Sequence, residues 1–289
     1  MVRLSNGSEM EVGLAGKEDG SVIMLPIAKK SVYGQEAEAL KIWGVDPELG
    51  EHFVDGLADT FKVLYFDYEG HLLRTPNPDY LTPDHIAKDF LLIADEMNVD
   101  QFSYYGYSWL AIAGLQLAIR TKRLESLIMG GFPPLDGPYK EMLIVTEKAY
   151  QQALDYQNLS NSARVKNDVP GTPDDIDWEN VEVKLDQNQT KQFVTMYQNL
   201  MSFDDRLIQT QLTMPRLAFA GEMDTIVYGE NFGNVTVDIV GLLKKNKKEL
   251  EQLGWDVEVL KGEGMDHTKA MQPINVLPLI KPWLVEKLL

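Results

Sequence analysis

Short apolar runs along the chain alternate with longer segments in which apolar positions recur every three or four residues. The short runs are rich in β-branched and aromatic residues and predict β-strands, whereas the longer segments predict amphipathic helices. The predicted strands are 21–27, 62–67, 101–106, 124–130, 216–221 and 256–260. Strands separated by helices in this way are typical of a parallel sheet covered on both faces. We therefore expect an α/β fold with a mostly parallel central sheet.

Proline marks the predicted start of two helices. Asp46-Pro47 and Thr82-Pro83 each place a potential capping side chain before a proline at the first helical position. Farther along, the segment 242–255 carries charged and apolar residues at helical spacing. This spacing predicts an amphipathic surface helix rather than a basic binding surface.

Two segments depart from the alternation. Asn6-Gly7, the dipeptide that most favours a type I′ turn, predicts a β-hairpin at the start of the chain. Residues 133–213 break the rhythm of strands and predict helices joined by a polar loop. We interpret this segment as a helical cap inserted into a core that consists of residues 1–132 and 214–289.

Composition and charge exclude several classes of function. The 289 residues are 44% hydrophobic, and a formal net charge of −17 would repel nucleic acid and an anionic membrane surface. The absence of cysteine excludes disulfides and thiolate nucleophiles. No dinucleotide fingerprint or zinc-like histidine pair appears, so we expect neither a cofactor nor a metal. Without a signal peptide or a membrane-spanning run, we expect a cytoplasmic protein that acts on a small molecule.

The stretch GYSWLAIAGLQLA runs from a predicted strand directly into an apolar helix, with Ser108 at the junction. A side chain on such a turn projects at the carboxyl edge of the sheet, where open α/β folds bind ligands. Gly106 suits the tight backbone that the turn requires. Ser108 is either a buried or capping hydroxyl or a nucleophile, and a nucleophile needs a base and an acid that orients the base.

One of the four histidines follows the last predicted strand. His267 lies in the loop GEGMDHTKA, which places it at the carboxyl edge of the sheet. His71 follows the strand 62–67, where it either lines the same edge or has a structural role. His52 and His85 lie in predicted helices and are expected to face solvent. His267 is therefore the candidate base.

Two aspartates also follow predicted strands. Asp224, in GEMD, comes directly after the strand 216–221, and it either orients the base or caps the next helix. Asp136 follows the strand 124–130 and is the alternative acid.

These features together resemble the α/β-hydrolase superfamily. The resemblance covers nearly the whole chain and rests on GYSWLAIAGLQLA, FDYEGH, GEMD and GMDH, and on the order serine, aspartate, histidine. It implies an α/β-hydrolase fold in which Ser108 is the nucleophile and His267 is the general base and then the acid. It also implies that Asp224 orients the histidine and that the inserted segment forms a cap.

The chain departs from the family pattern at two places. Leu110 stands where the elbow motif G-x-S-x-G usually has a glycine, so a local adjustment is expected. Pro26-Ile27 stands where the family commonly has His-Gly in the loop that completes the oxyanion hole. The Trp109 N–H can supply one donor, but proline has no N–H, so the second must come from Ile27 or Ala28.

The hydroxyl groups of Ser31 and Tyr33, farther along the same loop, could also contribute. Loss of one donor costs about 3–4 kcal/mol of transition-state stabilisation. Two functions therefore stay open. One is a serine hydrolase that attacks an ester, thioester, amide or related acyl carbon, and the other is a non-catalytic binding or interaction protein with an impaired oxyanion hole. We favour the hydrolase because all three side-chain types of a triad are present.

The segment 133–213 contains two further groups of residues. Its acidic cluster lacks the glycine and glutamate that an EF-hand requires, and we interpret it as a solvated loop. The cluster comprises Asp174, Asp175, Asp177 and Glu179. Its aromatic and methionine side chains are expected to pack the helices together; they are Tyr150, Tyr156, Phe193, Met196, Tyr197 and Met201.

Overall fold

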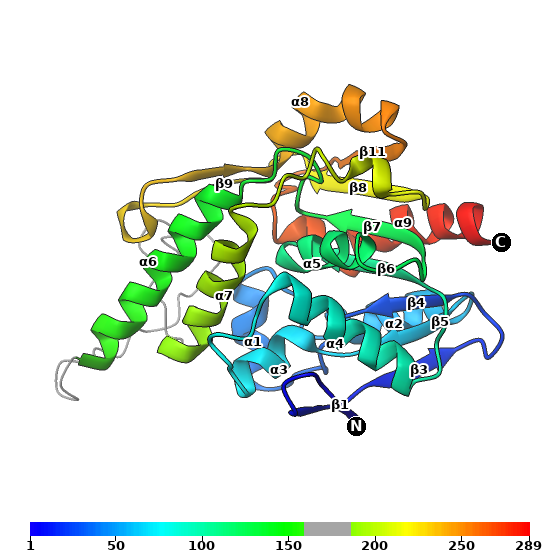
Figure 1. The fold of residues 1–289 in the computed structure, drawn as a ribbon, viewed down its shortest axis with the longest axis horizontal. Helices are drawn as coiled ribbons and strands as arrows, with labels where there is room; N and C mark the ends of the chain where they lie inside the picture. Colours follow the sequence, from blue (N-terminus) through cyan, green and yellow to red (C-terminus); the bar gives the residue numbers. More distant parts are fainter. Residues whose placement is uncertain (159–185) are drawn as a thin grey trace.

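The structure, a computed structural model, describes residues 1–158 and 186–289. One central sheet contains β3 (Gly13–Gly16), β4 (Val22–Leu25), β5 (Lys62–Tyr65), β6 (Phe102–Tyr107), β7 (Leu124–Gly130), β8 (Arg216–Gly221) and β11 (Trp255–Leu260). Their order across the sheet is β11-β8-β7-β6-β4-β5-β3 (Figure 1). Only β3 pairs antiparallel within it. The predicted fold class is confirmed.

All six predicted strands are present, each end lying within two residues of the prediction. The edge strand β3 was not predicted. Its sequence is GLAG, and none of its residues is buried, so it carries neither the β-branched content nor the buried face that marks the other strands. It forms because its backbone pairs with β5 along the whole of its length.

Helices cover both faces of the sheet. In the described residues they are α1 (Gln35–Ile42), α2 (Leu49–Ala58), α3 (Tyr68–Arg74), α4 (Pro83–Glu96), α5 (Trp109–Ala118), α6 (Tyr139–Asn158), α7 (Gln187–Leu200), α8 (Ile239–Gln252) and α9 (Pro273–Leu288). Helices α4, α5 and α8 share one apolar cluster with the sheet, and α2 and α9 share a second cluster on the opposite face. The strand-helix pattern thus produces three layers.

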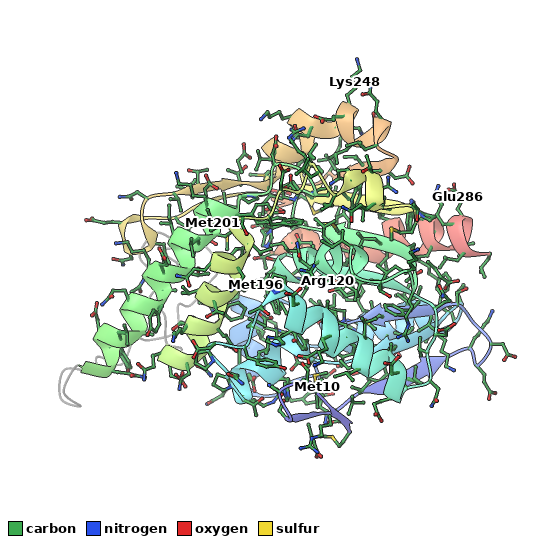
Figure 2. The ribbon with its side chains drawn as sticks, in the orientation of Figure 1. Met10, Arg120, Met196, Met201, Lys248 and Glu286 are labelled. Carbon is green, nitrogen blue, oxygen red and sulfur yellow. The ribbon has the colours of Figure 1, made fainter. Side chains whose placement is uncertain are left out.

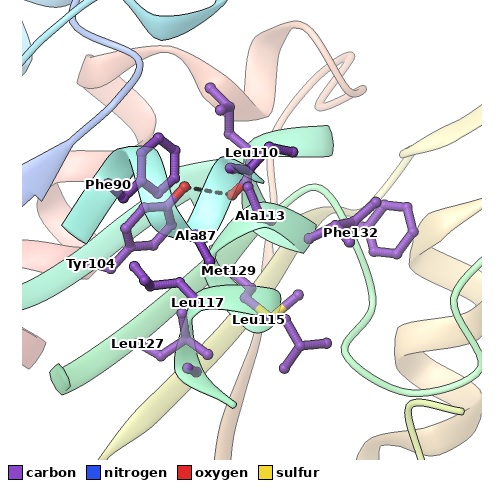
Figure 3. Close-up of a cluster of buried hydrophobic side chains, with 14 of the residues drawn as sticks. Ala87, Phe90, Tyr104, Leu110, Ala113, Leu115, Leu117, Leu127, Met129 and Phe132 are labelled. Carbon is purple, nitrogen blue, oxygen red and sulfur yellow. Dashed lines mark hydrogen bonds between the residues drawn. The ribbon is translucent and has the colours of Figure 1, made fainter. Parts of the chain in front are cut away.

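Strand β6 shows how the sequence divides between these clusters. All six of its residues are buried. Tyr104 packs with α4 and α5, whereas Tyr105 and Tyr107 belong to the cluster on the other face, as the two-residue period of a strand requires. Figure 3 shows Tyr104 among the aliphatic side chains of α5, where its hydroxyl donates to the Leu110 carbonyl at 2.7 Å. This hydrogen bond satisfies a polar atom in an otherwise apolar core.

The N-terminal hairpin is confirmed, but its predicted turn type is wrong. β1 (Val2–Arg3) and β2 (Glu9–Met10) pair antiparallel. A type I′ turn needs positive φ at both central residues, and here Gly7 has a φ of 86° while Asn6 is not in that region. The Gly7 N–H instead donates to the Leu4 carbonyl at 2.9 Å, which closes a turn one residue earlier.

The two predicted helix starts had different outcomes. Thr82 caps α4 as predicted, because its hydroxyl accepts from the His85 N–H. Asp46 does not begin a helix: α2 starts at Leu49, and the Asp46 carboxylate accepts from the Glu48 N–H at 2.9 Å in a turn before it. The predicted amphipathic helix 242–255 is present as α8, which begins three residues earlier and ends at Gln252.

The segment predicted to be a cap contains α6 and α7, which pack against each other. Met196 and Met201 both lie on this side of the molecule in Figure 2, Met196 buried and Met201 exposed after the end of α7. The acidic cluster of the sequence analysis lies outside the described residues. The division into a core and a cap stays a prediction.

Side chains of helix α7 donate hydrogen bonds to backbone carbonyls of the core and hold the helix against it. Gln192 and Gln189 donate to the carbonyls of Leu72 and Leu73, at 3.1 and 2.7 Å. Thr195 donates to the carbonyl of a proline in the next loop at 2.6 Å. These bonds hold α7 against the end of α3, which lies at the carboxyl edge of the sheet.

A second hairpin follows β8 and was not predicted. It consists of β9 (Thr225–Val227) and β10 (Thr236–Asp238), and α6 packs on it. No helix among the described residues is long and apolar enough to cross a membrane.

Candidate active site

Ser108 occupies a strained turn between β6 and α5. Its φ and ψ are 56° and −129°, a combination that costs free energy for a residue with a side chain and persists only where the surroundings enforce it. The Ser108 N–H donates to the Gly130 carbonyl at 2.8 Å. Gly106 is required here, since a Cβ at that position would lie 2.3 Å from the Leu110 carbonyl oxygen. The turn therefore has the geometry of a nucleophile elbow.

The elbow accommodates Leu110 because the close contacts between helix and sheet occur elsewhere. A Cβ on Gly114 would lie 2.3 Å from the Tyr104 ring, so α5 approaches β6 most closely at this glycine and at Gly106. Leu110 is itself buried in the core. The absent second glycine of the motif is thus compensated by Gly114, one turn farther along the helix.

His267 and Asp224 meet as predicted. His267 Nδ1 and Asp224 Oδ1 are 2.9 Å apart, with the carboxylate fully buried and the imidazole partly exposed. The other carboxylate oxygen, Oδ2, is buried without a partner among the described residues. This arrangement orients the imidazole so that Nε2 is the nitrogen free to act on a substrate or a hydroxyl.

Tyr107 holds the histidine from the neighbouring strand. Its hydroxyl donates to the His267 carbonyl at 2.8 Å, and the two rings lie 5.1 Å apart. Burial and the nearby Asp224 charge raise the pKa of Tyr107, so the phenol stays protonated and can donate. A Cβ on Gly131, whose φ is 63°, would lie 2.9 Å from the imidazole. The histidine therefore fits a tightly defined space.

Sequence reasoning missed Tyr107 and Gly131. Tyr107 stands directly before the serine, but its partner is 160 positions away, so no local pattern reveals the contact. The pair Gly130-Gly131 at the end of a predicted strand was the available signal for a close backbone approach.

Asp136, the alternative acid, serves another purpose. Arg206 contacts both of its carboxylate oxygens at 2.8 Å, and Asn246 donates to it at 3.1 Å. The hydrogen bonds from Arg206 lower the pKa of Asp136 below its ordinary value. Asp136 therefore joins the start of the inserted segment to its end, and it is not the partner of His267.

The other histidines are occupied away from the elbow. His52 is exposed and lies 2.6 Å from Asp46, whose hydrogen bond raises the pKa of the imidazole. His85 stacks on a tyrosine at the start of α4. His71 is buried on α3, where its Nε2 lies 2.9 Å from the Ser8 hydroxyl, and burial lowers its pKa. The structural reading of His71 is thus the one that the geometry supports.

The predicted oxyanion donors lie on two segments that face the same cavity. Trp109 is the first residue of α5, where a backbone N–H has no acceptor within the helix. Ile27 and Ala28 lie in the loop after β4 and line the cavity together with Trp109. In this loop Ile27 pairs with Asp67 through an isolated antiparallel β-bridge, and the Ile27 carbonyl accepts from the Lys29 N–H at 2.9 Å.

Glu69 links these two segments. One of its carboxylate oxygens lies 3.0 Å from Lys29 Nζ, and the other accepts from the Trp109 indole N–H at 3.3 Å. Burial opposes the charge of Lys29, but the attraction of Glu69 outweighs it and raises the pKa of the ammonium group. Glu69 belongs to the motif FDYEGH, yet its role was missed because the motif does not show which side chains meet across the sheet edge.

The hydroxyls of Ser31 and Tyr33 do not contribute to the oxyanion site in this structure. Ser31 donates to Glu51 at 2.6 Å, and the Tyr33 side chain is 73% exposed. Neither residue lines the cavities that contain Ser108, so the possibility that one of these hydroxyls contributes has no support in the structure.

Ser108 and His267 line two cavities. The larger, about 830 Å³, extends over Ile27, Trp109 and α1, and the smaller, about 200 Å³, lies beneath Tyr197 of α7. A group bound at Ser108 therefore has space on two sides. In the described part of the chain, no three carboxylate or imidazole side chains gather where a metal ion could bind.

Comparison of the sequence with protein-family models and with curated proteins finds no match. The structure nevertheless resembles solved structures over almost its whole length. A carboxylesterase of the thaumarchaeon Nitrososphaera gargenis is 16% identical, with 99% of this chain and 98% of that chain covered and a TM-score of 0.61. The esterase EaEST of Exiguobacterium antarcticum is 14% identical, with 99% and 98% covered and a TM-score of 0.57.

The chain has the α/β-hydrolase fold. MenH of S. aureus is likewise similar, at 14% identity with 96% of this chain and 98% of that chain covered and a TM-score of 0.56. At such identities the likeness establishes the fold alone. Within the α/β-hydrolase fold, the elbow after β6 and the loops after β8 and β11 carry Ser108, Asp224 and His267, respectively.

Proposed function

We propose that the protein is a serine hydrolase of the esterase type, acting on an ester, thioester, amide or related acyl compound. One observation carries the proposal: Ser108, on a strained turn, lines the same two cavities as His267, and His267 is hydrogen-bonded to the buried Asp224. Strained backbone of this kind clusters at functional sites, which favours a chemical role for Ser108. The esterases among the similar structures support the same reading.

In this mechanism the Ser108 hydroxyl attacks the acyl carbon while His267 Nε2 accepts its proton. Asp224 holds the imidazole in the tautomer that leaves Nε2 free, and it stabilises the imidazolium. The tetrahedral intermediate collapses when the imidazolium protonates the leaving group, and the acyl group stays on Ser108. Water, deprotonated by His267, then attacks the acyl-enzyme. The second tetrahedral intermediate collapses as the imidazolium protonates Ser108 Oγ, which releases the acid and restores the serine.

The negative oxygen of the intermediate is stabilised by the Trp109 N–H and by an N–H from Ile27 or Ala28. Pro26 cannot donate, so the competence of this pair depends on how the loop after β4 is held against the elbow. Glu69 supplies that connection through Lys29 and the indole of Trp109. Because Glu69 acts on the donors and not on the reacting atoms, it is a positioning residue.

A fluorophosphonate probe tests the proposal directly, because it reacts with a serine only when a base and an oxyanion site activate it. We expect covalent labelling of the folded protein at Ser108, measured by mass spectrometry of the labelled peptide, and loss of labelling in Ser108→Ala and His267→Ala. Ser31→Ala is the matched control, since that hydroxyl bonds Glu51, and labelling should persist. A folded protein that takes up no probe and turns over no acyl substrate would instead be the non-catalytic binding protein.

A further inference from the structure

The smaller cavity beside Ser108 has an uncharged lining. Apart from Ser108 and His267, its described lining residues are apolar or tyrosine, among them Phe132, Met142 and Ile226. Its volume of about 200 Å³ compares with an engineered apolar cavity of about 150 Å³ that binds benzene. A single ring or a short aliphatic chain therefore fits, and a charged group there would lose its hydration without a partner.

The larger cavity has charged lining residues, and among the described ones carboxylates outnumber cationic side chains. Its described lining includes three cationic side chains, each paired with a carboxylate that also lines it: Lys29 with Glu69 at 3.0 Å, Lys30 with Glu11 at 2.6 Å and Arg74 with Asp67 at 3.3 Å. Two more carboxylates line the cavity, those of Glu36 and Asp46. Asp46 contacts His52.

Glu36 lies on α1 with its side chain exposed, and it forms no ion pair with the described residues. An anionic ligand would therefore meet carboxylates and cations that are already neutralised by neighbours. A cationic ligand would meet at least one unpaired carboxylate, and the net charge of −17 adds a field of the same sign over a longer range.

We propose that the substrate carries a short, uncharged apolar group on one side of the scissile acyl bond and a larger neutral or cationic group on the other, and that anionic substrates are rejected. This inference rests on the proposed function, since the scissile bond lies at Ser108 between the two cavities. It narrows the substrate class from any acyl compound to one that is asymmetric in size and restricted in charge.

Three butyrate esters of similar shape test the charge preference. Butyrylcholine is cationic, 3,3-dimethylbutyl butyrate is its neutral analogue, and 3-sulfopropyl butyrate is anionic. The reversed esters, propyl esters of acids that carry the same three charges, allow the larger group to be on the acyl side. In at least one of the two sets we expect kcat/KM for the anionic ester to be lower than for the other two by about fivefold or more.

Salt separates charge from shape. As the Debye length falls from about 30 Å at 0.01 M salt to about 10 Å at 0.1 M, the differences between the three esters should shrink. Equal or higher kcat/KM for the anionic ester in both sets at low salt would overturn the proposal.

A matched pair of charge reversals locates the effect. Glu36→Lys changes the charge beside the larger cavity, and we expect it to raise kcat/KM for the anionic ester severalfold relative to the cationic one. Glu286→Lys changes the net charge by the same amount on α9, on the side of the molecule away from α1 (Figures 1 and 2). If both variants shift the ratio equally, the discrimination comes from the whole-protein field and not from the cavity.

Chain length tests the small cavity. One series of esters has a fixed alcohol and acyl groups of increasing length, and the other has a fixed acyl group and alcohols of increasing length. In one of the two series, kcat/KM should fall once the growing chain is longer than the small cavity can hold. Met142→Ala, which removes a side chain from α6, should move this limit to longer chains, and Ile226→Ala provides a second enlargement if the first variant does not fold. An unchanged limit in a folded variant would contradict the assignment of the small cavity.

Binding separates this inference from the proposed function. Calorimetric binding of the three esters to Ser108→Ala ranks the charges without any turnover. If the native protein is labelled by the fluorophosphonate but the anionic ester binds most tightly, the proposed substrate class is wrong and the proposed hydrolase activity stands. If the native protein is not labelled but the esters bind in the expected order of charge, the proposed hydrolase activity is wrong and a binding site of the stated selectivity remains.

Discussion

The two sides of Ser108 are held in place by different kinds of interaction. On one side, His267 is fixed by the fully buried Asp224 and by the Tyr107 hydroxyl, in a space that leaves no room for a Cβ on Gly131. On the other side, the loop after β4 is joined to the elbow through Glu69, whose ion-pair partner Lys29 has a side chain that is 53% exposed.

The difference separates a rigid side from an adjustable one. When a mutation removes one partner of a buried hydrogen bond, the other partner stays buried and unpaired, which costs its full desolvation free energy. Salt in the solvent does not weaken such a bond. A partly exposed ion pair is worth less and is screened by salt. We therefore expect changes on the histidine side to be large and independent of salt, and changes on the oxyanion side to be smaller and dependent on salt.

The largest effect is expected for Asp224→Asn. An amide cannot hold the imidazole in the required tautomer, so turnover should fall by about 10⁴-fold while the fold persists. Steady-state kinetics and circular dichroism measure the two quantities. Asp136→Asn is the control, because Asp136 also follows a strand but contacts Arg206. Loss of turnover in the control with retention in Asp224→Asn would reverse the assignment of the acid.

Tyr107→Phe comes next. It leaves the His267 carbonyl without its donor, and we expect the free energy of unfolding to fall by about 1–3 kcal/mol and kcat to fall more than KM changes. Urea unfolding and steady-state kinetics provide the readouts. Tyr105→Phe is a close control, since that hydroxyl, on the same strand, is buried without a partner in the described residues. If both variants behave alike, the Tyr107 hydroxyl does not position the histidine.

Glu69→Gln should have a smaller effect, because an ion pair of this exposure is worth at most about 1 kcal/mol. That corresponds to a roughly fivefold lower kcat at low salt. Raising the salt concentration should lower kcat of the native protein toward that of the variant. Glu38→Gln, which removes an exposed ion pair with Lys41 on α1, serves as the control. A salt response retained in full by Glu69→Gln would place its origin elsewhere.

The smallest effect concerns His71, which attaches the N-terminal hairpin to α3 on the oxyanion side. Burial lowers the pKa of this histidine, so the unfolded chain takes up a proton at a higher pH than the folded protein does. The contribution of neutral His71 to folding stability is therefore complete above the pKa of about 6.5 that histidine has in the unfolded chain. It decreases as the pH falls below that value.

Hydrogen exchange follows this change. Protection factors for residues 1–12 should decrease on acidification relative to those of β11, and His71→Asn should remove the difference. A hairpin whose protection is constant relative to β11 from pH 7.5 to about pH 5.5 would mean that His71 carries no such linkage.

The layered fold was predictable because the strands in the sheet centre are buried on both faces and therefore form short runs of mostly apolar and aromatic residues. Strand β6 is the clearest case, with every residue buried. The failures occurred where distant contacts decide. Asp46 does not begin a helix, and its N–H donates to the side-chain oxygen of Gln272, from the far end of the chain, at 2.9 Å. Strand β3 exists only through its partner β5.

The site divides in the same way. Ser108, Asp224 and His267 could be proposed from the sequence, because each follows a strand and parallel strands end at one edge. Tyr107 and Glu69 could not, since their contacts join segments that the sequence does not show to be adjacent. The competence of the oxyanion loop was equally inaccessible, because it depends on where the backbone N–H of Ile27 lies and not on which residue it is.

The attachment of α7 has a consequence for how this protein can vary. Gln189 and Gln192 donate to the carbonyls of Leu72 and Leu73, so the interaction depends on the course of the main chain and not on the identity of those two leucines. Side chains of α3, including that of Arg74 in the wall of the larger cavity, could therefore be exchanged while α7 stays anchored in the same place. Selectivity for the bound molecule can thus diverge without a change in architecture.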